Sequence, residues 1–115
     1  MPIHIDSIPK MVQSVIEYEE NVIVAFCSEE CEVCKEMKPI FLSLIKDYDQ
    51  EVHFVTYKAD INTERKLYTS SFEFVNGFPT WGTFKNGVFQ DYLTGEQTRD
   101  EFVRLLDNLV GKSNE

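Results

Sequence analysis

The sequence predicts an α/β domain built on a central mixed β-sheet with helices on both faces. Three observations lead to this prediction: helical and strand periodicities alternate along the chain, two short apolar runs indicate buried strands, and an Asn86-Gly87 pair marks a hairpin. A strand–helix–strand–helix order that ends in a hairpin and a helix combines parallel with antiparallel strand pairs. With 115 residues the chain fits one hydrophobic core, so we expect a single domain over residues 1–115.

The first half of the chain is expected to hold two helices around a buried strand. Apolar residues recur at helical spacing over roughly residues 7 to 19, with Pro9 tolerated in the first turn. The run NVIVAF, residues 21–26, is apolar, β-branched and too short for a helix, which predicts a central strand. A second helical pattern follows over residues 31–48. Pro39 should interrupt and kink that helix, because proline has no N–H to donate.

The second half predicts a strand, a short helix, a hairpin and a last helix. VHFVTYKAD, residues 52–60, has the composition of a second buried strand, and the polar segment 61–68 indicates a short helix. Residues 80–95 form two strand patterns around Asn86-Gly87, which suits the positive φ angles of a type I′ turn. Apolar residues at helical spacing over 102–110 predict the final amphipathic helix.

The charge balance excludes some partners. The chain carries 11 basic and 20 acidic residues, a net charge of −9, which opposes contact with phosphate backbones. Basic partners fit this charge better. There is no cationic start followed by an apolar run, and no apolar stretch near the ~20 residues of a membrane span. We expect a cytoplasmic monomer that binds neither nucleic acid nor membrane.

Three cysteines, Cys27, Cys31 and Cys34, lie within eight residues. An odd count at tight spacing favours a catalytic or metal-binding cluster over a disulfide scaffold. The C-x-x-x-C-x-x-C spacing also occurs in the iron–sulfur motif of radical S-adenosylmethionine enzymes, but those need a much larger barrel. A zinc site would need a fourth ligand, and His4 and His53 lie in elements with no evident path to the cluster. We therefore expect no metal and no cofactor.

Two motifs together resemble the thioredoxin family, over essentially the whole chain. Cys31-Glu32-Val33-Cys34 opens a helix with Lys35 and Pro39 behind it, and VNGFPTWGTFKNG follows downstream. A C-x-x-C motif alone is a weak signal. The same motif at a strand-to-helix junction, with a G-x-P-T segment about 45 residues later, is a strong one.

The resemblance implies roles for particular residues. Cys31 would be the exposed nucleophile, and Cys34 would resolve the mixed disulfide. Phe78, Pro79 and Thr80 would form a loop that packs against the dithiol, with a cis bond before the proline, and offers backbone groups to an extended substrate. Elementary electrostatics agrees with this division, because the free N–H groups of a helix N-terminus stabilise a thiolate at Cys31.

The chain also departs from the family pattern around this dithiol. Glu30 replaces the usual tryptophan, Glu32-Val33 replaces Gly-Pro, and Cys27 replaces a second tryptophan. Ala25 stands where the family has a buried acid that moves protons for the second cysteine, which bears on general reductase activity. Lys58 matches the lysine that partners this acid. Without the acid, Lys58 could point to solvent, pair with another carboxylate, or favour a Cys34 thiolate.

Glutamates at positions 29, 30 and 32 bracket Cys31. A partly exposed like charge at about 7 Å disfavours a thiolate by roughly 0.5 to 1 kcal/mol, and the helix N-terminus favours it by a comparable ~1 kcal/mol. Cys31 should have a pKa nearer the free value of about 8.5 than the ~7 of a thioredoxin, and a slow, reducing character. The same carboxylates should attract basic partners, at rates that fall as salt rises.

Several residues near the motif have two interpretations each. Cys27 is either a small buried hydrophobic residue at a strand end or a redox partner of the dithiol. Trp81 either points inward from its strand or partly replaces the missing tryptophan. Phe72, Phe74 and Phe78 either form a substrate platform or belong to the core.

Two classes of function follow. The first is a thiol–disulfide oxidoreductase that reduces or exchanges disulfides in protein or small-molecule substrates and is recycled by an external reductant or reductase. The second is a thioredoxin-fold binding module with weak or regulatory redox activity. Retention of both motif cysteines favours the oxidoreductase, whereas their altered neighbours favour the module.

Overall fold

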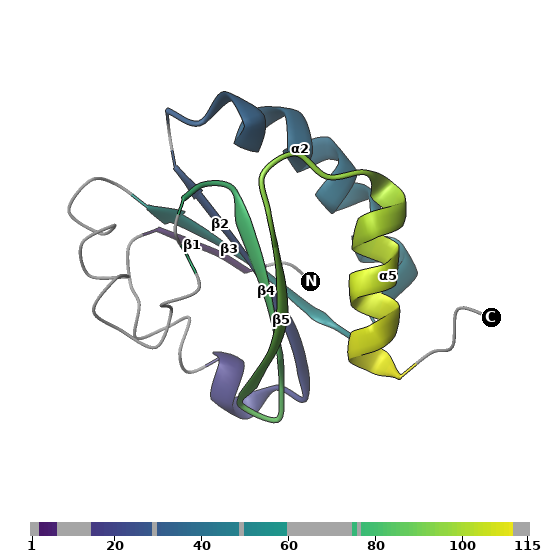
Figure 1. Cartoon of the computed structure of the whole chain (residues 1–115). Helices are drawn as coiled ribbons and strands as arrows, with labels where there is room; N and C mark the ends of the chain where they lie inside the picture. The colour runs from purple at the N-terminus through teal and green to yellow at the C-terminus, as the bar shows by residue number, and fades with distance from the viewer. Residues whose placement is uncertain are drawn as a thin grey trace.

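The computed structural model describes residues 3–6, 15–28, 30–48, 50–59, 75 and 77–111. Its centre is a five-stranded sheet in the order β1-β3-β2-β4-β5, with the long helices against it (Figure 1). The α/β class with a mixed sheet, predicted from the sequence, is confirmed. The elements are β1 (Ile3–Asp6), β2 (Asn21–Ser28), α2 (Glu32–Ser43), α3 (Ile45–Tyr48), β3 (His53–Ala59), β4 (Thr80–Lys85), β5 (Val88–Thr94) and α5 (Arg99–Val110).

Strand β2 is the centre of the sheet and pairs on both sides. It runs parallel to β3, from Val22 opposite His53 to Ser28 opposite Ala59, and antiparallel to β4. Strand β1 runs parallel to β3 at one edge, and β5 is antiparallel to β4 at the other. Both kinds of pairing therefore meet at β2, as the predicted order of elements requires.

Strand β1 was not predicted, and other predicted elements are described only in part. With only four residues, β1 is too short to show a strand periodicity that differs clearly from the helical pattern after it. Of the predicted helix over 7–19, residues 15–18 are helical and 7–14 lie outside the described residues. The predicted helix over 61–68 also lies outside them.

Alternate residues of β2 enter two hydrophobic clusters, one on each face of the sheet. Val22, Val24 and Phe26 join Ile16 of the helical segment 15–18 on one face. Residues Ile23 and Ala25 join α2 and α5 on the other face, where the main contributors are Met37, Phe41, Leu44, Trp81, Phe102, Leu105, Leu106 and Leu109. Helical residues thus cover both faces, and β2 is buried between them.

Helix α2 differs from its prediction at Pro39. The helix continues through Pro39 to Ser43, so the predicted interruption there is wrong, and the kink expected at Pro39 stays a prediction. The interruption comes at Leu44, whose N–H donates to the Phe41 carbonyl at 3.2 Å, a tighter bond than that of an α-helix. Proline removes only its own N–H from the ladder, and here the helix tolerates that loss.

Among the described helices, none is long and apolar enough to cross a membrane.

Helix α5 has capped ends and is tied to its surroundings. Thr98 and Glu101 form a capping box at its start, and Gly111 ends it with a φ of 81°. The Tyr48 hydroxyl donates to Asp107 at 2.6 Å, which joins α3 to α5. These contacts fix α5 against the face of the sheet that supports α2.

Trp81 points inward, as one of its two interpretations predicted. It is 1% exposed, and its ring meets Phe102 edge to face, with centroids 4.7 Å apart and an interplanar angle of 85°. Trp81 therefore belongs to the core that supports α5 and does not replace an exposed tryptophan beside the dithiol.

Replacing Phe102 by alanine should lower the free energy of unfolding by about 3 to 5 kcal/mol, because it opens a cavity beneath Trp81. Urea denaturation measures this loss. The matched control is Tyr18→Ala, since Tyr18 is 85% exposed and its loss should change stability by about 0.5 kcal/mol or less. Equal losses for the two variants would contradict the assigned core.

Candidate functional site

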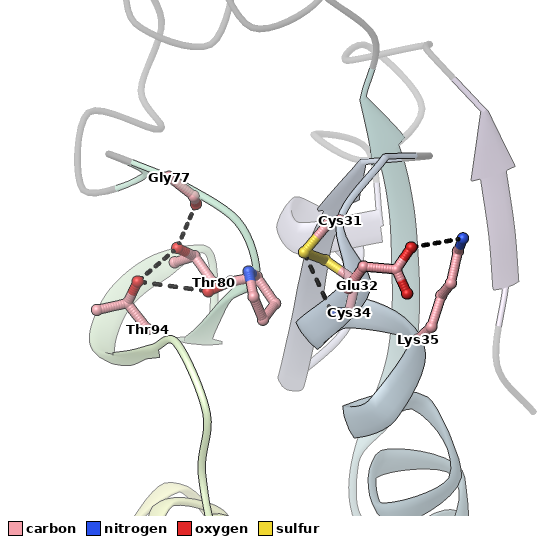
Figure 2. Close-up of a disulfide and its surroundings, with 8 residues drawn as sticks. Cys31, Glu32, Cys34, Lys35, Gly77, Thr80 and Thr94 are labelled. Carbon is pink, nitrogen blue, oxygen red and sulfur yellow. Dashed lines mark hydrogen bonds and ion pairs between the residues drawn. A yellow bond between two sulfur atoms is a disulfide. The ribbon is translucent and has the colours of Figure 1, made fainter.

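Cys31 stands where the chain leaves the central strand and enters α2. Its backbone is extended, with φ −85° and ψ 108°, and it is the N-cap of the helix. Its N–H donates to the Ser28 carbonyl at 3.3 Å, and its Sγ accepts the Cys34 N–H at 3.1 Å (Figure 2). A side chain that accepts a free N–H at this position is what a helix start favours. The sulfur thus occupies the place where a negative charge is best stabilised.

Cys31 and Cys34 form a disulfide (Figure 2). Their Cα atoms are 5.2 Å apart, within the usual range for a bridge. The two sulfur positions differ in access, because Cys31 is half-buried whereas Cys34 is only 6% exposed. A partner can reach Cys31 more readily than Cys34, and the division between an attacking and a resolving cysteine stays a prediction.

The Gly77–Thr80 segment lies at the same end of the sheet as the dithiol. Thr80 begins β4 opposite Phe26, two residues before the end of β2, so the chain enters β4 beside the point where it leaves β2. The Phe78–Pro79 peptide bond, for which the resemblance implies a cis geometry, is cis. Figure 2 shows Gly77 and Thr80 across from Cys31 and Cys34.

The aromatic platform can be tested at only one position. Phe78 is half-buried and packs against the cluster on the face opposite α2, so it is partly core and partly accessible. Phe72 and Phe74 lie outside the described residues. The predicted loop residues Phe78, Pro79 and Thr80 are contiguous here, and Pro79 and Thr80 are buried.

The position of the family's buried acid is apolar. Ala25 is 2% exposed and packs in the cluster beneath α2, so no carboxylate is available there. The backbone of Lys58 lies in β3 opposite Cys27, and its side chain lies outside the described residues. The three alternatives for Lys58 therefore stay predictions.

The predicted glutamates beside the dithiol are exposed, and one of them has a partner. Glu30 is exposed at the turn before Cys31. The Glu32 carboxylate lies 3.4 Å from the Lys35 ammonium, and these side chains are 81% and 64% exposed. Solvent weakens such a pair, but Lys35 still offsets part of the Glu32 charge. Glu30 has no ion-pair partner among the described residues, and Glu29 lies outside them.

Cys27 is a free, half-buried thiol that packs in the cluster beneath α2. Burial raises its pKa from the ordinary 9.0 to about 11, and the nearby Lys38 charge lowers it only in part. A thiol with this pKa stays protonated at neutral pH and is a poor nucleophile. These properties support the hydrophobic interpretation of Cys27 over the redox-partner one.

A separate hollow of about 470 Å³ lies at the other end of the sheet. It surrounds the first residues of β2 and β3, and its lining includes Glu19, Glu20, Asn21, Glu51 and His53. It holds no cysteine. Within the described residues, no group of three or more His, Cys, Asp or Glu side chains could hold a metal ion. The dithiol and the loop beside it are therefore the best candidate for a reacting site.

Sequence reasoning missed Thr94, the last residue of β5. Its Oγ1 lies 3.2 Å from the Thr80 Oγ1 and 3.3 Å from the Pro79 carbonyl oxygen. The turn at Asn86-Gly87 alone would have placed Leu93 opposite Thr80. A register shift between Thr83 and Phe84 puts Thr94 there instead.

Known proteins similar to this chain include thioredoxins and a protein disulfide-isomerase. The sequence model of the thioredoxin family matches residues 6–108. A thioredoxin from Acetoanaerobium sticklandii is 39% identical over 82 residues, which cover 71% of this chain and 74% of that protein. The protein disulfide-isomerase tigA of Aspergillus niger is 28% identical over 94 residues, 81% of this chain, and the chain spans about 26% of its length. The structure of a variant thioredoxin from Halobacterium salinarum, 19% identical, superposes with a TM-score of 0.78 over 95% of this chain and 90% of that one.

Replacing Cys27 by alanine should remove a loss of stability at alkaline pH. A thiol whose pKa is higher in the folded chain contributes its full stability below the unfolded pKa, 9.0, and loses it as pH rises towards about 11. Over that range the wild type should lose at most about 3 kcal/mol more than the variant. Urea unfolding of both oxidised proteins between about pH 8 and pH 10.5 measures the difference. Parallel stability profiles would contradict the burial of Cys27.

Proposed function

Because this chain belongs to the thioredoxin family, we propose that it is a thiol–disulfide oxidoreductase in which Cys31 attacks and Cys34 resolves. The Cys31 thiolate would attack one sulfur of a substrate disulfide, forming a mixed disulfide and releasing the first substrate thiolate. The Cys34 thiolate would then attack the Cys31 sulfur and release the second. Two electrons pass to the substrate, the released thiolates take protons from water, and Cys31–Cys34 is left oxidised.

The observation that carries this proposal is the hydrogen bond from the Cys34 N–H to the Cys31 sulfur at the start of α2. A charged sulfur accepts this bond more strongly than a neutral one does, so the bond and the helix N-terminus together lower the cost of forming the thiolate. Burial of Cys34 keeps it from competing for the substrate until the mixed disulfide forms beside it.

Return to the reduced dithiol needs an external electron donor, and we assign this step to a dithiol reductant or a reductase. Among the relatives is an NADPH-dependent thioredoxin reductase 3 from Arabidopsis thaliana, 24% identical over 86 residues. This cycle fits a reducing compartment such as the cytoplasm, with the protein acting as a monomer.

Two features support a slow and selective reductase rather than a general one. With Ala25 in place of an acid, the second cysteine must lose its proton to water or to another group, which slows resolution. Exposed carboxylates at Glu30 and Glu32 favour disulfides flanked by basic residues, because like charges on both partners reduce the rate of encounter.

The same two features support a second candidate, a binding module whose dithiol is weak or regulatory. Reduction of insulin disulfides in the presence of dithiothreitol separates the two. An oxidoreductase should accelerate insulin precipitation at catalytic concentrations, whereas a module should not exceed the rate of dithiothreitol alone.

Replacing single cysteines tests the proposed roles. Cys31→Ser should abolish insulin reduction, and Cys34→Ser should trap a mixed disulfide with the substrate because nothing resolves it. Cys27→Ser should keep activity, since a protonated thiol takes no part in exchange. A thiol count on the wild type should fall by two on mild oxidation. Loss of activity in Cys27→Ser, or a Cys34 that stays free after oxidation, would refute the assignment.

Removing the carboxylates beside Cys31 should speed its alkylation. In reduced protein at pH 7, Glu30→Gln should raise the rate with neutral iodoacetamide by about threefold, because each nearby charge shifts the thiol pKa by roughly half a unit. Glu32→Gln should have a smaller effect, since Lys35 already offsets its charge.

The matched control is Glu17→Gln, an exposed glutamate of the helical segment 15–18, which precedes the opposite end of β2. The effect of Glu30→Gln should shrink at ~1 M salt, where the Debye length is about 3 Å. A Cys31 pKa below about 6, or equal rates for Glu30→Gln and the control, would remove the electrostatic argument.

A further inference from the structure

Two threonine hydroxyls and one backbone N–H meet at the loop before β4. The Thr80 hydroxyl donates to the Gly77 carbonyl at 2.8 Å and lies 3.2 Å from the Thr94 hydroxyl (Figure 2). The Thr94 hydroxyl also lies 3.3 Å from the Pro79 carbonyl oxygen, and the Gly95 N–H donates to that same oxygen at 2.9 Å. The carbonyl groups of Gly77 and Pro79, which flank Phe78 in the sequence, therefore each accept a hydrogen bond.

A β-bulge is what brings Thr94 to this position. Next to the turn, Lys85 pairs with Val88 and Phe84 with Phe89, whereas beyond it Thr83 pairs with Asp91. One residue of β5, Gln90, is therefore passed over, and every later residue shifts by one place. Bulges redirect side chains in this way and are frequent beside active sites.

Each of the two threonine hydroxyls has a single proton to donate. Thr80 is fully buried, so its single hydroxyl proton must stay inside the protein, and the Gly77 oxygen is its nearest acceptor. The Thr94 proton can then go to the Thr80 oxygen or to the Pro79 carbonyl. In either arrangement Thr94 connects the end of β5 to the loop, and in the first it also strengthens the bond from Thr80 to Gly77.

The backbone of Phe78 lies between the two held carbonyls. Its own N–H and C=O make no hydrogen bond within the described part of the chain. An extended peptide could therefore pair with these groups as a strand pairs with a sheet edge. Holding both neighbours in place reduces the entropy that the loop would lose on binding.

We propose that Thr94 is a positioning residue that presets the Phe78 backbone for peptide disulfides. The inference rests on the proposed oxidoreductase function and on the loop that the resemblance implies for extended substrates, and what it adds is the role of Thr94. A small disulfide without amide groups makes no use of the Phe78 backbone. Thr94 should therefore matter for peptides and not for small disulfides, which separates positioning from a general effect on the dithiol.

The experiment compares two substrates and three variants in single-turnover reactions with pre-reduced protein. The substrates are a disulfide-bonded basic peptide and bis(2-hydroxyethyl) disulfide. Thr94→Val keeps the shape but loses the hydroxyl, and Thr94→Ser keeps the hydroxyl. Thr94 is exposed, so neither change disturbs the core. The control is Tyr48→Phe, which removes a buried hydroxyl that joins α3 to α5 at Asp107, away from both the loop and the bulge.

Thr94→Val should lower the second-order rate with the peptide about three- to tenfold, the effect of one lost hydrogen bond, and leave the small-disulfide rate unchanged. Thr94→Ser should restore the peptide rate. Tyr48→Phe should lower the melting temperature but keep the ratio of the two rates. Hydrogen exchange of the Gly95 amide should speed up in Thr94→Val, which reports the loosened loop without any substrate.

Equal losses on both substrates, no loss on the peptide, or the same change of ratio in Tyr48→Phe would overturn the positioning role. A wild-type protein that reduces neither disulfide would refute the proposed function, and the inference with it. A wild type active on both, with Thr94→Val indistinguishable from it, would refute the inference alone.

Discussion

The pairing of β2 with neighbours on both sides is the constraint on which the rest of the structure depends. A strand buried on both faces and bonded along both edges can neither slide nor tilt without losing its ladder, so its end point is fixed. Cys31 follows that end by a short turn and caps α2, while the Phe26–Thr80 pair fixes where β4 begins. Strand β2 therefore fixes the positions of both the dithiol and the loop facing it, although more than 40 residues of chain separate them.

The three cysteines show how position decides chemistry. Cys27 is still in β2, packed among apolar side chains that raise its pKa and keep it protonated. Cys31, four residues later, has left the sheet and accepts an N–H at a helix start. Cys34 lies one turn further, buried but within bonding distance of Cys31. Desolvation opposes a thiolate at the first position, and hydrogen bonding favours one at the second, so the same side chain has two different reactivities.

The sequence predicted the features that local signals determine. The buried β2, the Asn86-Gly87 hairpin and the start of a helix at Cys31 each depend on a few adjacent residues, and all three are present. The bulge in β5 could not be predicted, because an extra residue in a ladder is chosen by packing between strands. Here the Phe84 and Phe89 rings pack with their centroids 5.7 Å apart. The strands keep the register set by the turn as far as this pair and shift beyond it. Thr94 was missed for the same reason, since only the shifted register gives it a partner.

Where this chain departs from its family, the substitutions change charge and polarity but leave the backbone arrangement in place. Ala25, Glu30 and Glu32 alter where protons and partner charges can go, but none of them forms the turn, the cap or the strand pairing that brings Cys31 to the loop. Geometry decides which sulfur is attacked and from which side, because it fixes access and the line of approach. Charge decides how much thiolate is present and which partners arrive. In the proposed mechanism these two properties are set by different residues, so a chain of this fold could change its rate and its choice of partner and still attack through the same cysteine.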